Sequence, residues 1–282
     1  MMMYDLIVVG AGLHALTLLC ALLEEDHMDL DLVDATKGAV RSRRNERTMR
    51  KKLLERRKLS QQQIWKGKKI LVIDKFGKWL QNWKKQFEVL NIESLRSNAG
   101  LHPDPYDPEM LFEFARMKGW STEDAFDEIS EVKRGKHFVG PFLVPKTAIF
   151  NSFCEFLIDS YKLRDAVMTA EVTSIQPSPP PQTGNITENS QCFRLGLHDG
   201  RCIECRRVVV AIGHSNLPNY PDWVDREVCP PSVVLHAWEL AHLDLSNQSI
   251  QQSTIAVIGG GLTSIQLTNG SSPQLCKGLS DF

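Results

Sequence analysis

The sequence predicts an α/β fold built on a parallel sheet, and three observations predict it. Residues 4 to 25 read as an apolar strand, a glycine turn and an apolar helix. Residues 68 to 74 form a second continuously apolar strand that ends in an acid. Residues 255 to 261 repeat the strand and the glycine turn. Strands that are apolar throughout are typical of a sheet covered on both faces, as in Rossmann-like folds.

The composition is that of a globular protein with one large domain or two ordinary ones. Of its 282 residues, 42% are hydrophobic, which is enough for a sizeable core. No run of about 18 apolar residues marks a membrane span, and the first strand starts too early for a charged leader. Seven scattered cysteines suit a reducing compartment better than a disulfide framework. We therefore expect a soluble, cytoplasmic protein.

The first glycine turn has the pattern GxGxxA, formed by Gly10, Gly12 and Ala15, with Leu13 and His14 between them. The first glycine permits the tight turn, the second lets the backbone approach a pyrophosphate, and the small Ala15 lets the helix pack on the strand. The N–H groups at the start of the helix then face the anionic phosphates. The pattern predicts dinucleotide binding; the alternative is a tight turn without a ligand.

An acid at the end of the second strand would bind the ribose hydroxyls of a dinucleotide. Asp34 has nearly the usual spacing but ends the alternating stretch DLDLVD, whereas Asp74 ends the continuously apolar ILVID. A central strand buried on both faces favours Asp74, and Asp34 remains the alternative. Residues 37 to 67 are then an insert before the second strand.

This insert is strongly basic. Residues 37 to 69 hold 14 Lys or Arg against Glu46 and Glu55, while the rest of the chain holds 19 basic and 32 acidic residues. Such a segment is too charged for a core, so we expect a solvated helix or a disordered insert. A polyanion contact is the alternative. With Trp65 as the one aromatic residue and no base-reading motif, we do not expect nucleic acid to be the partner.

The remaining elements follow from periodicity and turn residues. Residues 108 to 118 carry Met110, Leu111, Phe114 and Met117 at helical spacing after a proline, which predicts an amphipathic helix. Residues 147 to 161 repeat this pattern. Residues 170 to 213 read as two or three antiparallel strands, with a loop at 177–184, a tight turn at 198–200 and a closing strand at 206–213.

Six segments occur in the order seen in a known family: YDLIVVGAG, VIDKFGKWLQNW, LRSNAGLHPDPYDP, GPFLVPKTAIFNSFCEFL, VVVAIGHSNLPNYPDW and VIGGGLTSIQL. The chain resembles the FAD- and NADP-binding monooxygenase-like flavoproteins, in the branch that includes the lysine and ornithine N-hydroxylases. The resemblance covers most of the chain outside the basic insert. Ala211, Ile212 and Gly213 resemble the family's ATG turn, with Ile in place of Thr.

The resemblance implies a Rossmann-like FAD-binding domain with an antiparallel β-hairpin insertion, at residues 1–36 and 68–254, interrupted by the basic insert at 37–67. Residues 255–282 would form the start of a second, incomplete Rossmann-like domain that binds NADP. Trp79, Trp83, Arg96 and His102 would lie near the flavin, although the tryptophans fit a core equally well and Arg96 a surface ion pair. The implied cofactor-binding residues are Gly10, Gly12, Leu13, His14, Ala15, Asp74, Lys75, Trp83, Arg96, Ala211, Gly213, Gly259, Gly261 and Ser264.

The second fingerprint, GxGxxS, consists of Gly259, Gly261 and Ser264, and in the family it holds NADPH. A full strand, helix and strand unit needs about 30 residues, whereas 21 follow Gly261. We therefore expect an incomplete NADPH site and a truncated or alternatively spliced form of a longer flavoprotein.

The implied activity is that of an FAD-dependent monooxygenase, in which NADPH reduces the flavin and O2 oxygenates a small, amine-like nucleophilic substrate. No catalytic residue is assigned, because a flavin carries the oxygen chemistry itself. The alternative is a catalytically silent FAD-binding fragment. Cys202 and Cys205 form a CxxC, but alternation puts them on opposite faces of a strand, so a disulfide reductase is disfavoured. No metal site is predicted, because the histidines lack metal spacing.

Overall fold

The computed structural model describes residues 3–23, 68–105, 107–129, 142–179, 192–213, 218–225, 227–230, 233–240, 256–259 and 261–268. Asp34 and the basic insert at 37–67 therefore lie outside the described residues. The chain divides into two compact units. Unit 1 comprises Met1–Trp79, His102–Pro108 and Cys154–Ala211, and unit 2 comprises Leu80–Leu101, Glu109–Phe153 and Ile212–Phe282.

Unit 1 contains a parallel four-stranded sheet. Its strands are β2 (Leu6–Val9), β3 (Ile70–Asp74), β6 (Val167–Thr169) and β10 (Val208–Val210), in the order β10-β2-β3-β6. The register pairs Leu6 with Ile70 and Val9 with Ile73. The predicted strand that ends at Asp74 is thus confirmed as the neighbour of β2. Strand β6, preceded by the short helix η1 (Arg164–Ala166), was not predicted.

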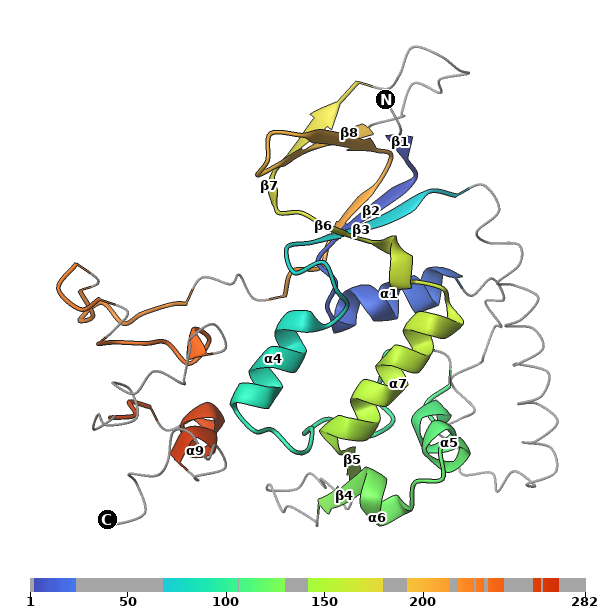
Figure 1. Ribbon diagram of the computed structural model, residues 1–282, viewed down its shortest axis with the longest axis vertical. Helices are drawn as coiled ribbons and strands as arrows, with labels where there is room; N and C mark the ends of the chain where they lie inside the picture. Colours follow the sequence, from blue (N-terminus) through green and yellow to red (C-terminus); the bar gives the residue numbers. More distant parts are fainter. Residues whose placement is uncertain are drawn as a thin grey trace, which may run out of the picture. The chain divides into compact units, whose positions relative to one another are not determined.

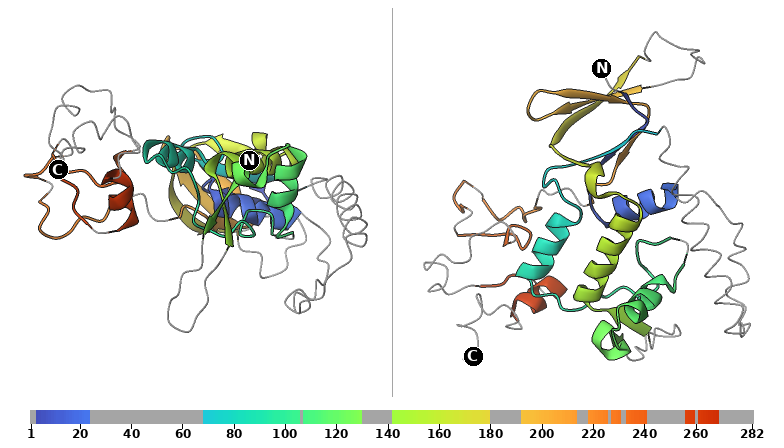
Figure 2. Two further views of the ribbon diagram at one scale, coloured as in Figure 1. Left: turned by 90° about the horizontal axis from the view of Figure 1, so that it is seen from below. Right: turned by 45° about the vertical axis from the view of Figure 1, so that its right-hand side comes forward.

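An antiparallel sheet lies beside the parallel one (Figures 1 and 2). It consists of β7 (Val172–Ser178), β8 (Cys192–Leu197) and β9 (Cys202–Cys205), and β1 (Met3–Tyr4) adds to β9 in parallel. The predicted turn at 198–200 is confirmed: Gly200 has a φ of 82°, and its N–H donates to the Leu197 carbonyl at 3.0 Å. Strand β7 includes the first two residues of the predicted loop at 177–184.

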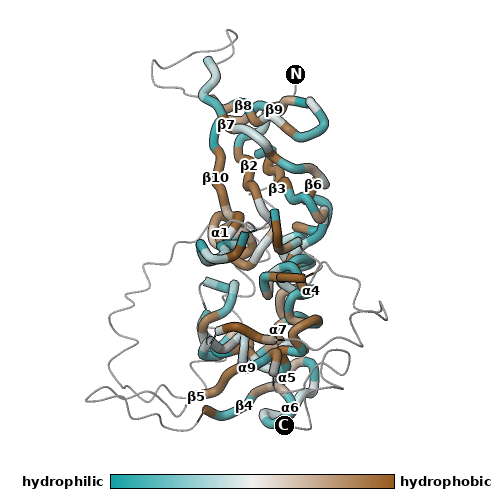
Figure 3. The backbone as a smooth tube through the Cα atoms, turned by 90° about the vertical axis from the view of Figure 1, so that its left-hand side faces the viewer, coloured by the Kyte–Doolittle hydropathy of each residue, from teal (hydrophilic) through white to brown (hydrophobic). Residues whose placement is uncertain are grey.

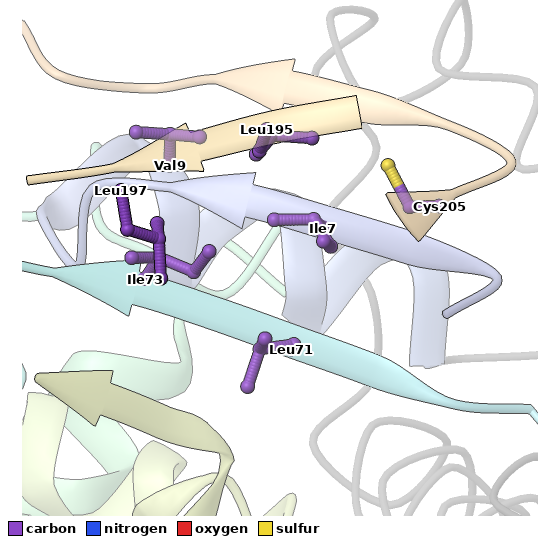
Figure 4. Close-up of a cluster of buried hydrophobic side chains, with 7 residues drawn as sticks. All are labelled: Ile7, Val9, Leu71, Ile73, Leu195, Leu197 and Cys205. Carbon is purple, nitrogen blue, oxygen red and sulfur yellow. The ribbon is translucent and has the colours of Figure 1, made fainter. Parts of the chain in front are cut away.

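The core of unit 1 lies between these two sheets. Side chains from β2 and β3 face side chains from β8 and β9 (Figure 4), and the cluster consists of Ile7, Val9, Leu71, Ile73, Leu195, Leu197 and Cys205. Alternation turns Val8 and Val72 to the other face of the sheet, where they are also fully buried. Strands β2, β3 and β10 are accordingly drawn mainly in the hydrophobic colour (Figure 3). Helix α1 (Leu13–Leu23) follows β2 and buries Ala15, Leu16, Leu19, Cys20 and Leu23.

Unit 2 is mainly helical. It contains α4 (Gln81–Val89), α5 (Met110–Met117), α6 (Thr122–Ala125), the hairpin of β4 (Phe126–Ile129) and β5 (Phe142–Pro145), and α9 (Leu262–Thr268). Helix α7 (Thr147–Ser160) confirms the helix predicted at 147–161. The boundary between the two units falls within this helix. Phe114 of α5 and Phe153 of α7 are both fully buried, with ring centroids 5.4 Å apart.

Two predictions for unit 2 need correction. Met117 was placed on the apolar face of α5, but its side chain is 64% exposed because it is the last residue of the helix and lies beyond the buried Phe114 and Ala115. The strand predicted before the second glycine turn is not formed at residues 256–258, where Ile258 is 75% exposed. A strand needs a neighbour for its backbone groups, and the described residues after Ala211 contain α9 and no strand.

Candidate functional site

The first glycine turn joins β2 to α1 and is anchored to β3. Gly10 has a φ of 102°, a conformation that side chains other than glycine rarely adopt. Its N–H donates to the Ile73 carbonyl at 2.8 Å. The next N–H, of Ala11, donates to Oδ2 of Asp74 at 2.9 Å. Two consecutive peptide groups of the turn are therefore held against the end of β3.

The start of α1 supplies hydrogen-bond donors beside this turn. The first helical bond runs from the N–H of Leu16 to the carbonyl of Gly12, at 3.1 Å. The first N–H groups of a helix have no acceptor within it, and the helix dipole makes this end attractive to anions. The backbone at Gly12, Leu13 and His14 is thus suited to a phosphate group.

Space over the turn fits this interpretation. A Cβ added to Gly12 would meet nothing within 4 Å, so a ligand has room to approach the backbone. Ala15 is fully buried, which agrees with the small residue that close packing of helix and strand requires. The side chain of His14 is exposed. The residues present therefore fit the diphosphate of a dinucleotide.

Asp74 lies at the carboxyl end of β3, next to the turn. Its Oδ1 accepts from the N–H of Phe76 at 2.8 Å, and its Oδ2 accepts from Ala11. A carboxylate oxygen can accept more than one hydrogen bond, so both oxygens retain capacity for a ribose hydroxyl. Lys75 is exposed, with its Nζ 5.1 Å from the centroid of the Phe76 ring.

The loop after Asp74 contacts β6 in a way that the sequence did not reveal. Gly77 has a φ of 67°, and its N–H donates to the Asp74 carbonyl at 3.1 Å. The same carbonyl accepts from Ala170, just after β6, at 3.2 Å. A Cβ on Gly77 would come 2.0 Å from Oγ1 of Thr169. The motif DKFG contains a turn glycine, but nothing in the sequence indicated its partner.

Ala211 also borders the first glycine turn. It follows β10, and its N–H donates to the carbonyl of Val9 at 2.8 Å. Gly213, two residues later, has a φ of 69° and is exposed, and it belongs to unit 2. The positive φ explains a glycine at the end of the predicted AIG turn.

Trp79 and His102, which were also expected near the flavin, belong to unit 1. Trp79 is 6% exposed, and its Nε1 donates to the Leu163 carbonyl at 2.9 Å, as expected of a core tryptophan. The Nε2 of His102 lies 3.3 Å from the Pro108 carbonyl oxygen. The structure therefore gives both side chains contacts within unit 1.

Trp83 and Arg96 belong to unit 2. Trp83 of α4 stacks on Phe87, with centroids 3.9 Å apart, and lies 5.8 Å from Phe150 of α7. Arg96 is exposed. The first glycine turn belongs to unit 1, and the place of these two residues near a flavin stays a prediction.

The second glycine turn has part of the expected geometry. Gly259 has a φ of 129°, and a Cβ there would lie 3.1 Å from Oγ of Ser264 on α9. Gly261 is exposed and would accept a Cβ without contact. Gln266 of α9 donates from Nε2 to the Asn91 carbonyl at 3.1 Å. Helix α9 and the positive φ of Gly259 are thus present, whereas the described residues 256–258 form no strand.

The two cysteines of the CxxC differ in burial. Cys202 is exposed, Cys205 is fully buried, and neither is in a disulfide. Burial raises the pKa of the Cys205 thiol to about 11, so it is protonated at neutral pH. In the described ranges, no group of three His, Cys, Asp or Glu side chains could hold a metal ion. No helix among the described residues is both long enough and apolar enough to cross a bilayer.

Comparison with known proteins gives a fold relationship. No protein-family model and no curated protein matches the chain. Among solved structures, the ornithine hydroxylase PvdA from Pseudomonas aeruginosa is 15% identical, with a TM-score of 0.53 over 95% of this chain and 51% of that chain.

Two other matches have lower TM-scores. The ornithine N-hydroxylase KtzI from Kutzneria sp. 744, with reduced FAD, NADP+ and L-ornithine, is 15% identical over 75% of this chain and 38% of that chain, with a TM-score of 0.38. A flavin monooxygenase from Stenotrophomonas maltophilia is 14% identical over 79% and 43%, with a TM-score of 0.35. The fold relationship rests on PvdA: the chain has a fold similar to that ornithine hydroxylase and spans about half of its length.

Proposed function

We propose that the chain binds FAD at the carboxyl ends of β2 and β3, as the FAD-binding part of a monooxygenase-type oxidoreductase that uses NADPH. The observation that carries this proposal is the hydrogen bond from Ala11 to Asp74, which joins the glycine turn to the acid. The open space over Gly12 and an acid at this strand end both support the proposal, because a dinucleotide site uses the first for the diphosphate and the second for the ribose.

Each residue of the site has a defined task. Gly10 sets the turn, and the N–H groups of Gly12, Leu13 and His14 would hold the diphosphate. Asp74 would accept hydrogen bonds from the hydroxyls of the adenosine ribose. Bound FAD would supply the redox chemistry, accepting a hydride from NADPH and passing electrons to O2. A small amine-like nucleophile is the proposed substrate, on the resemblance to the lysine and ornithine N-hydroxylases.

An absorption spectrum of the purified protein tests FAD binding. The protein should be yellow, or should become so on reconstitution with FAD. Replacement Gly12→Val should leave the fold intact, because the added Cβ meets nothing within 4 Å, but should prevent FAD retention by filling the room for the diphosphate. Replacement Gly261→Val, also into open space, is the matched control and should retain FAD. Wild-type protein that stays colourless after reconstitution would contradict the proposal.

A second candidate function is FAD binding without reduction by NADPH. It is favoured by residues 256–258, which lie outside any strand although a nucleotide-binding turn normally follows one. Anaerobic addition of NADPH to the FAD-loaded protein separates the two functions. Bleaching of the flavin absorption by NADPH supports the oxidoreductase. Bleaching by dithionite but not by NADPH supports the silent FAD-binding protein.

A further inference from the structure

The carboxylate of Asp74 contacts two backbone segments at once. Its Oδ2 accepts from Ala11 in the glycine turn at 2.9 Å, and its Oδ1 accepts from Phe76 in the turn after β3 at 2.8 Å. Ala11 and Asp74 are 63 residues apart in sequence. The side chain therefore joins the fingerprint turn to the loop of the neighbouring strand.

The segment that it holds would otherwise be mobile. Ala11 stands between two glycines, which have the largest backbone freedom of all residues. The bond from the Gly10 N–H to Ile73 fixes one peptide group, and the bond from Ala11 to Asp74 fixes the next. Ordering a peptide group costs about 1–2 kcal/mol of conformational entropy. If the protein alone orders the turn, a ligand does not have to do so on binding.

We propose that Asp74 is a positioning residue for the diphosphate site, in addition to any contact with ribose. This inference rests on the proposed FAD site. The bond to Asp74 occupies the Ala11 N–H, so the diphosphate is left with the N–H groups at the start of α1. Asp74 thereby fixes the direction in which these groups point before FAD arrives.

The roles of charge and of hydrogen bonding can be separated with two variants. Asp74→Asn keeps one acceptor oxygen, which can serve Ala11 while the amide NH2 faces the Phe76 N–H, and it loses the negative charge. Asp74→Ala loses both acceptors and the charge. Asp5→Ala is the matched control, because Oδ2 of Asp5 accepts from the N–H of Lys69 at 2.9 Å, just before the same strand β3. That contact is also between a carboxylate and the backbone, but it lies at the amino end of the strand.

Amide hydrogen exchange in the ligand-free protein gives the first test. In Asp74→Ala, the Ala11 amide should exchange about tenfold faster than in wild type, the size expected for loss of one hydrogen bond to a charged group. In Asp74→Asn and in Asp5→Ala, its exchange should stay within about threefold of wild type. Unchanged exchange in Asp74→Ala would overturn the positioning role.

Binding of inorganic pyrophosphate, measured by calorimetry, gives the second test, because this probe has no ribose. Asp74→Asn should bind it about fivefold more tightly than Asp74→Ala, since both lack the charge and one keeps the acceptor. Equal affinities would overturn the inference.

The two proposals fail in different ways. Wild-type protein that binds pyrophosphate but not FAD overturns the proposed function, and the Asp74 variants then decide whether Asp74 positions a pyrophosphate site. If wild-type protein binds FAD, but Asp74→Asn and Asp74→Ala have the same Ala11 amide exchange rate and the same affinity for pyrophosphate, the positioning role alone is overturned. Wild-type protein that binds neither ligand overturns both.

Discussion

Gly77 lies so close to Thr169 that a Cβ on the glycine would come 2.0 Å from the threonine Oγ1. The two residues join the loop after β3 to the last residue of β6. With a φ of 67°, Gly77 also has a backbone conformation that favours glycine. The loop that follows Asp74 is therefore held in place by a contact that only glycine permits.

Replacement Gly77→Ala should destabilise unit 1 by about 2–4 kcal/mol, because it adds backbone strain to a steric clash. The free energy of unfolding in urea measures this loss. Gly200→Ala is the matched control in the same unit: Gly200 has a φ of 82°, and a Cβ there meets nothing within 4 Å. It should lose about 1–2 kcal/mol, from strain alone. Equal losses in the two variants would show that Thr169 does not constrain the loop.

Replacement Trp79→Phe tests whether this tryptophan is a core residue or a flavin contact. Phenylalanine keeps an aromatic ring but leaves the buried carbonyl of Leu163 without the Nε1 donor, so the protein should lose about 1–3 kcal/mol of stability. Its affinity for FAD should stay at the wild-type value. Trp83→Phe serves as the comparison, because the Trp83 ring stacks on the Phe87 ring with their centroids 3.9 Å apart. A Trp79→Phe variant with normal stability and weakened FAD binding would contradict the core role.

Helix α5 offers a contrast between two apolar residues. Phe114→Ala should cost about 3–5 kcal/mol, because Phe114 is fully buried against Phe153 and its removal leaves a cavity. Met117→Gln should change stability by no more than about 0.5 kcal/mol, because Met117 is 64% exposed. Thermal unfolding followed by circular dichroism compares the two. A large loss in Met117→Gln would mean that another part of the chain covers this side chain.

The strands and helices with strong hydrophobic patterns could be predicted from the sequence. Strands β2 and β3 are continuously apolar because both faces of the sheet are covered, and α5 and α7 show helical spacing. Strand β6 has three residues, too few to give a pattern. The hairpin of β4 and β5 was not predicted either, because Asp127 and Glu128 interrupt any apolar run.

The site could be predicted residue by residue, but its contacts could not. The pattern around Gly10 and the acid at Asp74 indicated a common site, because the carboxyl ends of neighbouring parallel strands meet at one edge. That the carboxylate holds the Ala11 N–H depends on the register of β2 and β3, which the sequence does not state. The contact of Gly77 with Thr169 likewise depends on the unpredicted strand β6.

The two cysteines of the CxxC should differ in reactivity. At pH 8, iodoacetamide should modify Cys202 on the order of a hundredfold faster than Cys205, because Cys202 is exposed whereas burial raises the pKa of Cys205 to about 11. Peptide mass mapping over time distinguishes them from the other cysteines. Cys202→Ser should abolish the fast modification of this peptide. Similar rates at both positions would instead indicate that β9 opens readily.

The raised pKa of Cys205 also makes stability depend on pH. The folded state binds the thiol proton more tightly than the unfolded chain, whose cysteine has a pKa near 9. The contribution to stability is therefore complete below pH 9 and declines as the pH rises towards about 11. Comparison with Cys205→Ala removes the effects of other titrating groups. The difference in free energy of unfolding between wild type and variant should shrink by about 2 kcal/mol between pH 8 and about 10.5. A constant difference would show that the thiol is not kept protonated by burial.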